Sequence, residues 1–137
     1  MTGKERAVMY HNRGYDCAQA VACAYCEKAG IDPETMFIAM EGFGRGMGGM
    51  EGTCGAISGA VAVAGAMNSS ANLEKPDSKQ STYELSRQII GKFREKNGAT
   101  VCRELKGIET GTVLRPCQGC IEDACDILEE VIPETGD

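Results

Sequence analysis

Residues 54–67 read CGAISGAVAVAGAM, a stretch in which nearly every residue is small or apolar. A helix with no polar face is typical of a segment that is packed on all sides, because nothing in it favours solvent. Small side chains also allow neighbouring helices to approach closely. We therefore expect a central helix here, and the most buried segment of the chain.

The segment before this helix is rich in glycine. Residues 42–55 hold seven glycines in fourteen positions, which predicts a glycine-rich loop. Residues 44–49 match the spacing of a dinucleotide-binding fingerprint, but no strand precedes them and no βαβ unit surrounds them. We expect instead that this backbone approaches a neighbouring helix or a ligand beside Cys54, with amides able to hold an anion. The candidate cofactor-binding positions are Gly46, Gly48 and Gly49.

Outside this core the sequence carries helix signals and no alternating strand pattern. Thr2 with Glu5 and Asp16 with Gln19 have capping-box spacing, and Asp16 predicts a helix over residues 17–29. Apolar residues at four-residue spacing predict an amphipathic helix over residues 81–97. A last helix is expected from Pro116 to about residue 132, closed by Pro133. The fold class is all-α: one domain over residues 1–137, a bundle of about five to six helices.

Composition excludes several classes of function. The 137 residues carry a net charge of −6, with 42% hydrophobic and 25% charged residues. Such an acidic chain offers no basic face, so neither nucleic acid nor a membrane surface is an expected partner. No apolar run of signal-peptide type is seen near the start, and none is long enough to span a bilayer. We expect a cytoplasmic protein.

The most informative residues are the eight cysteines. In a reducing compartment cysteines serve catalysis or metal binding more often than disulfide scaffolds. Four of them are predicted in first helical turns, where free amides and the helix dipole stabilise a thiolate. Those four are Cys17, following Asp16; Cys54, following Thr53; Cys102, two residues after Thr100; and Cys117, following Pro116.

Two pairs have Cys-x-x-Cys spacing, Cys23 with Cys26 and Cys117 with Cys120. The second pair stands at a helix start, the setting that makes dithiols reactive, so Cys120 is the expected resolving partner of Cys117. Neither pair is followed by His, so covalent haem is not expected. On the last helix Cys117 shares the apolar face, whereas acidic residues including Asp123 occupy the opposite face. For Cys23, Cys26 and Cys125 we favour simple packing.

The cysteine contexts resemble a known family. The segment 16–21, DCAQAV, resembles the first cysteine segment of the family named for the pattern C-GCAxxG-C-C, and the glycine run leading to TCGAISG at 53–59 resembles its second. Cys102 in VCREL and Cys117 before IEDA are similar to the third and fourth cysteines. Gly55 and Ala56 follow Cys54, so the literal GCAxxG string is not reproduced. The resemblance implies a redox-active protein, and the other four cysteines lie outside the family's pattern.

Three hypotheses follow from the sequence. The leading one is a thiol redox protein that exchanges electrons with a partner protein or a small thiol or electron carrier. Its candidate catalytic residues are Cys17, Cys54, Cys102, Cys117 and Cys120. The alternative is a metal-binding module in which an iron–sulfur cluster or zinc is held by Cys17, Cys54, Cys102 and Cys117. The third is an interaction domain with inert cysteines. Whether the chain is a thiol-dependent oxidoreductase or forms a homodimer stays open.

Overall fold

The computed structural model describes residues 1–132. Within that range the chain forms eight α-helices and two short turns of other helical types, with no strand beyond an isolated bridge between Thr53 and Val101. None of these helices is both long and apolar enough to cross a membrane. The elements are α1 (Gly3–Asn12), α2 (Cys17–Ala24), α3 (Cys26–Ala29), α4 (Pro33–Met40), η1 (Glu41–Phe43), η2 (Gly46–Met50), α5 (Gly55–Asn68), α6 (Lys79–Asn97), α7 (Cys102–Leu105) and α8 (Cys117–Val131).

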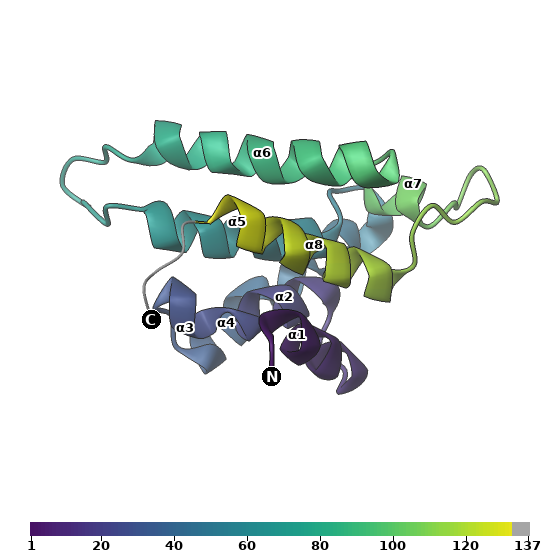
Figure 1. Cartoon of the computed structure of the whole chain (residues 1–137), viewed down its shortest axis with the longest axis horizontal. Helices are drawn as coiled ribbons and strands as arrows, with labels where there is room; N and C mark the ends of the chain where they lie inside the picture. The colour runs from purple at the N-terminus through teal and green to yellow at the C-terminus, as the bar shows by residue number, and fades with distance from the viewer. Residues whose placement is uncertain (133–137) are drawn as a thin grey trace.

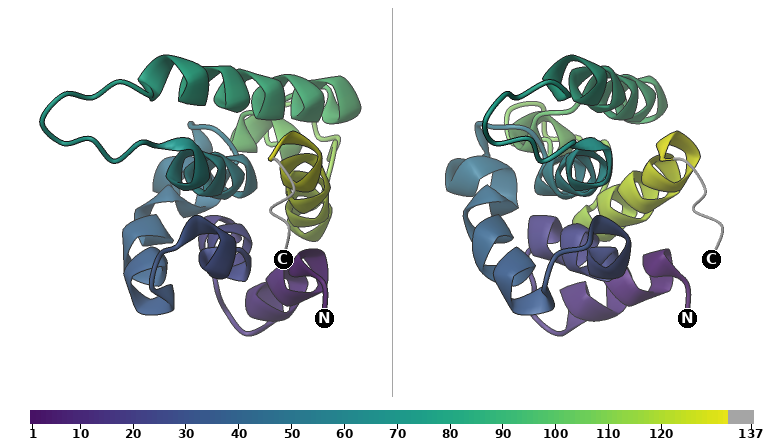
Figure 2. Two further views of the ribbon diagram at one scale, coloured as in Figure 1. Left: turned by 60° about the vertical axis from the view of Figure 1, so that its left-hand side comes forward. Right: turned by 90° about the vertical axis from the view of Figure 1, so that its left-hand side faces the viewer.

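Helix α5 lies at the centre of the bundle, as the sequence predicts. It packs against α2, α6 and α8, and its residues Ile57, Ala60 and Val63 are fully buried. Helix α6 covers α5 on one side, α1 to α4 cover the other, and α8 crosses beside α5 (Figures 1 and 2). This packing buries the first half of α5 more fully than the second. The expectation that α5 is the most buried segment is wrong: every residue of α2 from Ala18 to Ala24 is buried, because α1, α4, α5 and α8 all pack against it.

Small residues set the spacing between α2 and α5. A Cβ atom at Gly59 would lie 2.7 Å from the carbonyl oxygen of Ala18, so only glycine permits this approach. Ala18, Ala20 and Ala22 on α2 are themselves fully buried. Because the two helices run this close, the residues at their N-terminal ends are also brought together.

The predicted caps hold α1 and α2 in place. Thr2 with Glu5 and Asp16 with Gln19 both form reciprocal capping boxes. Asp16 accepts a hydrogen bond from the Gln19 amide at 2.9 Å, which fixes Cys17 as the first residue of α2. Helix α6 ends as predicted, at Gly98 with a left-handed φ of 81°. Local sequence signals therefore place most helix ends correctly.

The structure differs from the expectations in two places. The described residues hold eight helices instead of five to six, partly because the helix predicted over 17–29 breaks at Tyr25 into α2 and α3. The Tyr25 hydroxyl donates to Glu129 on α8 at 2.7 Å, so a tertiary contact accompanies the break. The segment predicted as a glycine-rich loop contains η1 and the irregular turn η2. Pro133, expected to close the last helix, lies outside the described residues.

Candidate functional site

Five of the eight cysteines line one cavity. It has a volume of about 290 Å³ and lies where α2, α5, α7 and α8 begin. The first turns of α5, α7 and α8 gather at the right-hand end of the molecule in Figure 1. Every residue proposed from the sequence as catalytic is in its wall. The wall comprises His11, Asp16, Cys17, Arg45, Cys54, Cys102, Leu105, Lys106, Arg115, Cys117 and Cys120.

Each of the four predicted cysteines stands at a helix start. Cys17, Cys102 and Cys117 are the first residues of α2, α7 and α8, and Cys54 is the N-cap of α5. Three of the predicted starts are shifted by one residue: Cys54 itself caps α5 in place of Thr53, Val101 caps α7 in place of Thr100, and Pro116 is itself the cap of α8. At α5 the free amides of the first turn act on a cavity sulfur, since the Ala56 and Ile57 amides hydrogen-bond Cys54.

Backbone hydrogen bonds between distant segments bring these helix starts together. The Cys54 amide donates to the Thr100 carbonyl at 2.8 Å, and the Cys102 amide donates to the Gly52 carbonyl at 3.0 Å. These two bonds join the segment before α5 to the segment before α7. The Leu114 amide donates to the Leu105 carbonyl at 2.9 Å, which returns the chain to α7 just before α8 begins.

Two glycines make room for the sulfurs. A Cβ atom at Gly55 would lie 2.5 Å from the Cys17 sulfur, and one at Gly46 would lie 2.5 Å from the Cys102 Cβ. Gly46 also has a φ of 57°, which glycine adopts without strain. Gly46 is thus the one predicted cofactor-binding glycine beside a cavity cysteine. Gly48 and Gly49 are exposed and do not line the cavity.

Cys54 and Cys120 form the most polarised pair of thiols. A hydrogen bond from the Cys120 thiol, with help from the amides of Ala56 and Ile57, lowers the pKa of Cys54 to about 7 against the effect of burial. The same contact and burial raise the pKa of Cys120. By distance and angle the Cys120 thiol donates to the Arg115 carbonyl at 3.6 Å, and an anionic Cys54 sulfur is the stronger acceptor for the same proton. The pair therefore joins an ionisable thiol to a protonated one.

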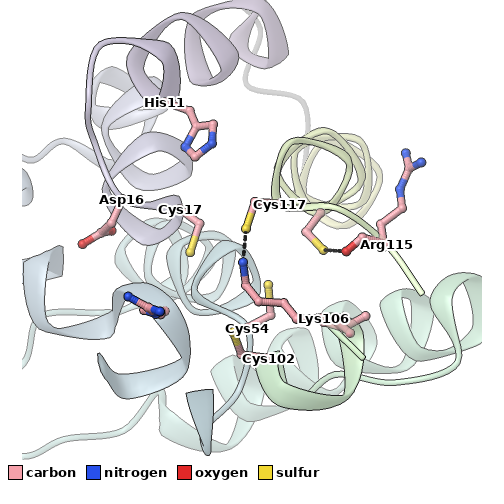
Figure 3. A pocket seen from close by; sticks show the side chains of 11 residues that line it. His11, Asp16, Cys17, Cys54, Cys102, Lys106, Arg115 and Cys117 are labelled. Atoms are coloured by element: carbon pink, nitrogen blue, oxygen red, sulfur yellow. Dashed lines mark hydrogen bonds between the residues drawn. The ribbon is translucent and has the colours of Figure 1, made fainter. Parts of the chain in front are cut away.

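Lys106 enters the cavity beside Cys117. Its Nζ donates to the Cys117 sulfur at 2.6 Å, and Figure 3 shows the ammonium between Cys117 and the sulfurs of Cys54 and Cys102. This contact is the main reason that the pKa of Lys106 is raised, and the charges of Cys117, Cys102 and Cys17 add to it. Lys106 was not predicted from the sequence, because no motif or spacing distinguishes it from the other lysines of the chain. Only its place one residue after α7 could have singled it out.

Burial favours the protonated form of two other cavity thiols, Cys17 and Cys102. It raises the pKa of Cys17 to about 11, although the Arg45 amide acts in the opposite direction. Burial likewise raises the pKa of Cys102, and Lys106 partly offsets it. Arg45 has a left-handed φ of 56°, uncommon for a residue with a side chain. That conformation aims its amide at the Cys17 sulfur.

The comparisons with known proteins identify the family. A sequence profile for the family described as "Putative redox-active protein (C_GCAxxG_C_C)" matches residues 15–131. The chain belongs to this family. No curated protein matches the chain, and no solved structure matches it. The matched residues include Cys17, Cys54, Cys102 and Cys117, the four cysteines whose contexts resemble the family's pattern, and these stand at the four helix starts around the cavity.

The family pattern does not mark the charged network behind the cavity. Asp123, predicted on the exposed face of α8, is 1% exposed. Its carboxylate accepts from Arg115 Nε at 3.1 Å and Asn97 at 3.1 Å, and it forms an ion pair with Lys96 at 2.8 Å. The helical projection failed here because α6 and the loop before α8 both supply cations to that face. The network fixes Arg115, and with it the start of α8.

The remaining cysteines lie away from the cavity. Cys23 and Cys26 stand on either side of the break at Tyr25 and line a different hollow, and Cys125 is fully buried. Burial raises the pKa of Cys23 to about 12 and that of Cys125 to about 12. Cys26 also has a raised pKa, again chiefly because of burial. These three thiols fit the expectation of simple packing.

The metal-binding alternative has its four cysteines in one place. Cys17, Cys54, Cys102 and Cys117 all face the cavity. Across residues 1–132, however, no group of three or more His, Cys, Asp or Glu residues is arranged so that it could hold a metal ion. As described, the cavity is a set of thiols with an ammonium among them.

Proposed function

We propose that the chain is a dithiol redox protein that works by thiol–disulfide exchange, with Cys54 and Cys120 as the exchanging pair. The observation that carries the proposal is the placement of the two thiols in one cavity, Cys54 at the N-cap of α5 and Cys120 in the first turn of α8. Their surroundings polarise them in opposite directions. One thiol has a pKa near neutrality and its neighbour stays protonated. A low-pKa nucleophile beside a protonated partner is the arrangement that efficient dithiol exchange requires.

The exchange proceeds in two balanced steps. The Cys54 thiolate attacks one sulfur of a disulfide R–S–S–R, forming a mixed disulfide and expelling RS⁻. Cys120 then gives its proton to the departing thiolate and attacks the Cys54 sulfur, which releases the second RS⁻. This thiolate takes up from solvent the proton that Cys54 lost on ionising. Two protein thiols are oxidised to one protein disulfide while one external disulfide is reduced to two thiols. The reverse sequence returns electrons to the protein.

The contacts favour Cys54 over Cys117 as the partner of Cys120. The Cys-x-x-Cys spacing suggested Cys117 for this role, but the Cys117 sulfur is engaged by Lys106 at 2.6 Å. The contact with Cys54 is the main reason that the pKa of Cys120 is raised, whereas Cys117 affects that pKa only by charge. Cys17, Cys102 and Cys117 then serve as neighbouring thiols that can relay the disulfide. All three line the same cavity.

Disulfide mapping tests the proposal. Protein purified without oxygen and fully reduced is treated with one equivalent of bis(2-hydroxyethyl) disulfide, trapped with acid and mapped by peptide mass spectrometry. We expect a Cys54–Cys120 disulfide as the main product, lost in both Cys54→Ser and Cys120→Ser. Cys23→Ser removes a comparably buried cysteine outside the cavity and should leave the product unchanged.

Metal analysis of the same preparation distinguishes the dithiol proposal from the metal-binding alternative. The dithiol proposal predicts no stoichiometric metal and a full count of free thiols after reduction. Stoichiometric iron or zinc that disappears in Cys54→Ser would instead support the cluster or zinc site formed by Cys17, Cys54, Cys102 and Cys117. A main disulfide that excludes Cys54 would overturn the assignment of the pair.

A further inference from the structure

The charges in the cavity differ from those of the chain as a whole. The chain carries a net charge of −6, yet Arg45, Lys106 and Arg115 all contribute to the cavity wall. Arg115 is neutralised by Asp123. Arg45 and Lys106 pair with no carboxylate among residues 1–132. Two uncompensated cations therefore face the thiols.

The single carboxylate of the wall, Asp16, offsets only part of this positive charge, and it helps to raise the pKa of Cys17. Asp16 is the N-cap of α2, and its carboxylate accepts a hydrogen bond from the Gln19 amide at 2.9 Å. Gly44 packs against its far side, since a Cβ there would collide with the carboxyl group. In Figure 3 the Asp16 carboxylate points away from the sulfurs. The interior of the cavity is thus electropositive, apart from any charge on the thiols themselves.

The depth of the reactive pair limits the size of its substrate. Cys54 is 6% exposed and Cys120 is 3% exposed. A disulfide on the surface of a folded protein cannot align with a sulfur at this depth, because attack requires the three sulfurs to lie in line. The cavity, at about 290 Å³, lies at the lower end of the range for small-molecule sites. A small disulfide can enter it.

We propose that the cavity selects a small anionic disulfide as the exchange substrate of Cys54. Lys106 and Arg45 attract the anionic groups, and the Cys54 thiolate attacks the disulfide bond between them. This inference rests on the proposed thiol–disulfide exchange. It adds that Lys106 and Arg45 determine specificity through charge, at a site where cations also raise the rate of encounter.

The test compares three disulfides of similar size and different charge. They are 3,3′-dithiodipropionate, which is dianionic; bis(2-hydroxyethyl) disulfide, which is neutral; and cystamine, which is dicationic. The rate of Cys54 oxidation is measured by quenching and mass spectrometry at low salt. Each rate constant is divided by that of 2-mercaptoethanol with the same disulfide, which removes differences in intrinsic reactivity.

We expect the normalised rate for the dianion to exceed that for the neutral disulfide by about tenfold, and to fall as salt is added. Arg45→Gln and Lys106→Gln should each reduce this preference several-fold. Lys28→Gln removes the same charge from α3, at the opposite end of the molecule in Figure 1, and should leave the preference unchanged.

The outcomes distinguish this inference from the proposed function. If none of the three disulfides oxidises Cys54, the exchange itself is wrong. If all three oxidise it but the neutral or the cationic disulfide reacts at least as fast as the dianion, exchange stands and the anion selectivity is overturned. Oxidised thioredoxin reacting faster than the dianion would overturn the small-substrate assignment and favour a protein partner.

Discussion

Cys54 in the cavity and Cys23 outside it differ less in burial than in what surrounds their sulfurs. Cys54 is 6% exposed and Cys23 is 8% exposed, nearly the same value. The pKa of Cys54 is nevertheless lowered to about 7, whereas that of Cys23 is raised to about 12. Cys54 has helix amides, a thiol donor and Lys106 around it; Cys23 has mainly the cost of burial. Neighbouring donors and charges, not depth, separate a reactive thiol from a packing residue here.

The largest effect on stability is expected from the ion pairs of Asp123, which anchor the start of α8 beside the cavity. Asp123→Asn removes a buried charge that pairs with Arg115 and Lys96, and should lower the free energy of unfolding by about 3 kcal/mol. Urea unfolding of the reduced protein measures this change. Asp126→Asn is the matched control, since its pair with Lys4 is exposed and should contribute less than about 1 kcal/mol. Equal effects for the two variants would show that the network does not anchor α8.

A smaller effect is expected where α5 meets the Cys17 sulfur. Gly55→Ala places a methyl group against this sulfur and 3.0 Å from the Phe43 carbonyl oxygen, which should cost about 2 kcal/mol of stability. Gly91→Ala on α6 meets nothing within 4 Å and should stabilise the protein by about 0.5–1 kcal/mol. Thermal unfolding compares the two. A neutral Gly55→Ala would mean that the cavity cysteines are less closely packed than described.

The smallest effect is expected on cysteine reactivity when the positive charge of Lys106 is removed from the cavity. Lys106→Gln removes the ammonium that donates to Cys117 while keeping a polar side chain. We expect alkylation of Cys102 by iodoacetamide at pH 7 to slow about fivefold, equivalent to about 1 kcal/mol, because the charge of Lys106 lowers the pKa of Cys102 against the effect of burial. Cys23, outside the cavity, should keep its rate. A uniform change at every cysteine would indicate loss of structure and not loss of a local charge.

The sequence predicted the fold and the members of the site more fully than the interactions within it. Capping boxes and the small-residue helix are local signals, and they placed α1, α2 and α5 correctly. The predicted helix starts then selected four cysteines, and the structure places all four in the wall of the cavity. Those signals act over a few residues, which is why they can be read from one sequence.

What could not be predicted depends on contacts between distant segments. Lys106 meets Cys117 only because the chain folds back through the Leu114–Leu105 hydrogen bond. Asp123 is buried because α6 and Arg115 bring cations to a face of α8 that looks exposed on its own. The partner of Cys120 depends likewise on the packing of α5 against α8. No spacing within one helix carries this information.

The pH dependence of alkylation at Cys54 and Cys23 tests the central claim most directly. Reduced, folded protein is pulsed with iodoacetamide between pH 5 and pH 10, and each cysteine peptide is quantified. The rate at Cys54 should rise to half its maximum near pH 7, because its thiol ionises there, while Cys23 is still gaining reactivity at pH 10.

At pH 7 the thiolate fractions of the two cysteines differ by roughly 10⁵, and the weaker nucleophilicity of the low-pKa sulfur offsets roughly 10² of that. Cys54 should therefore react at least about 100-fold faster than Cys23. That result, lost when Cys120→Ala removes the thiol donor, is what the polarised pair predicts. Equal rates at pH 7, or a Cys54 profile that rises only above pH 9, would contradict it.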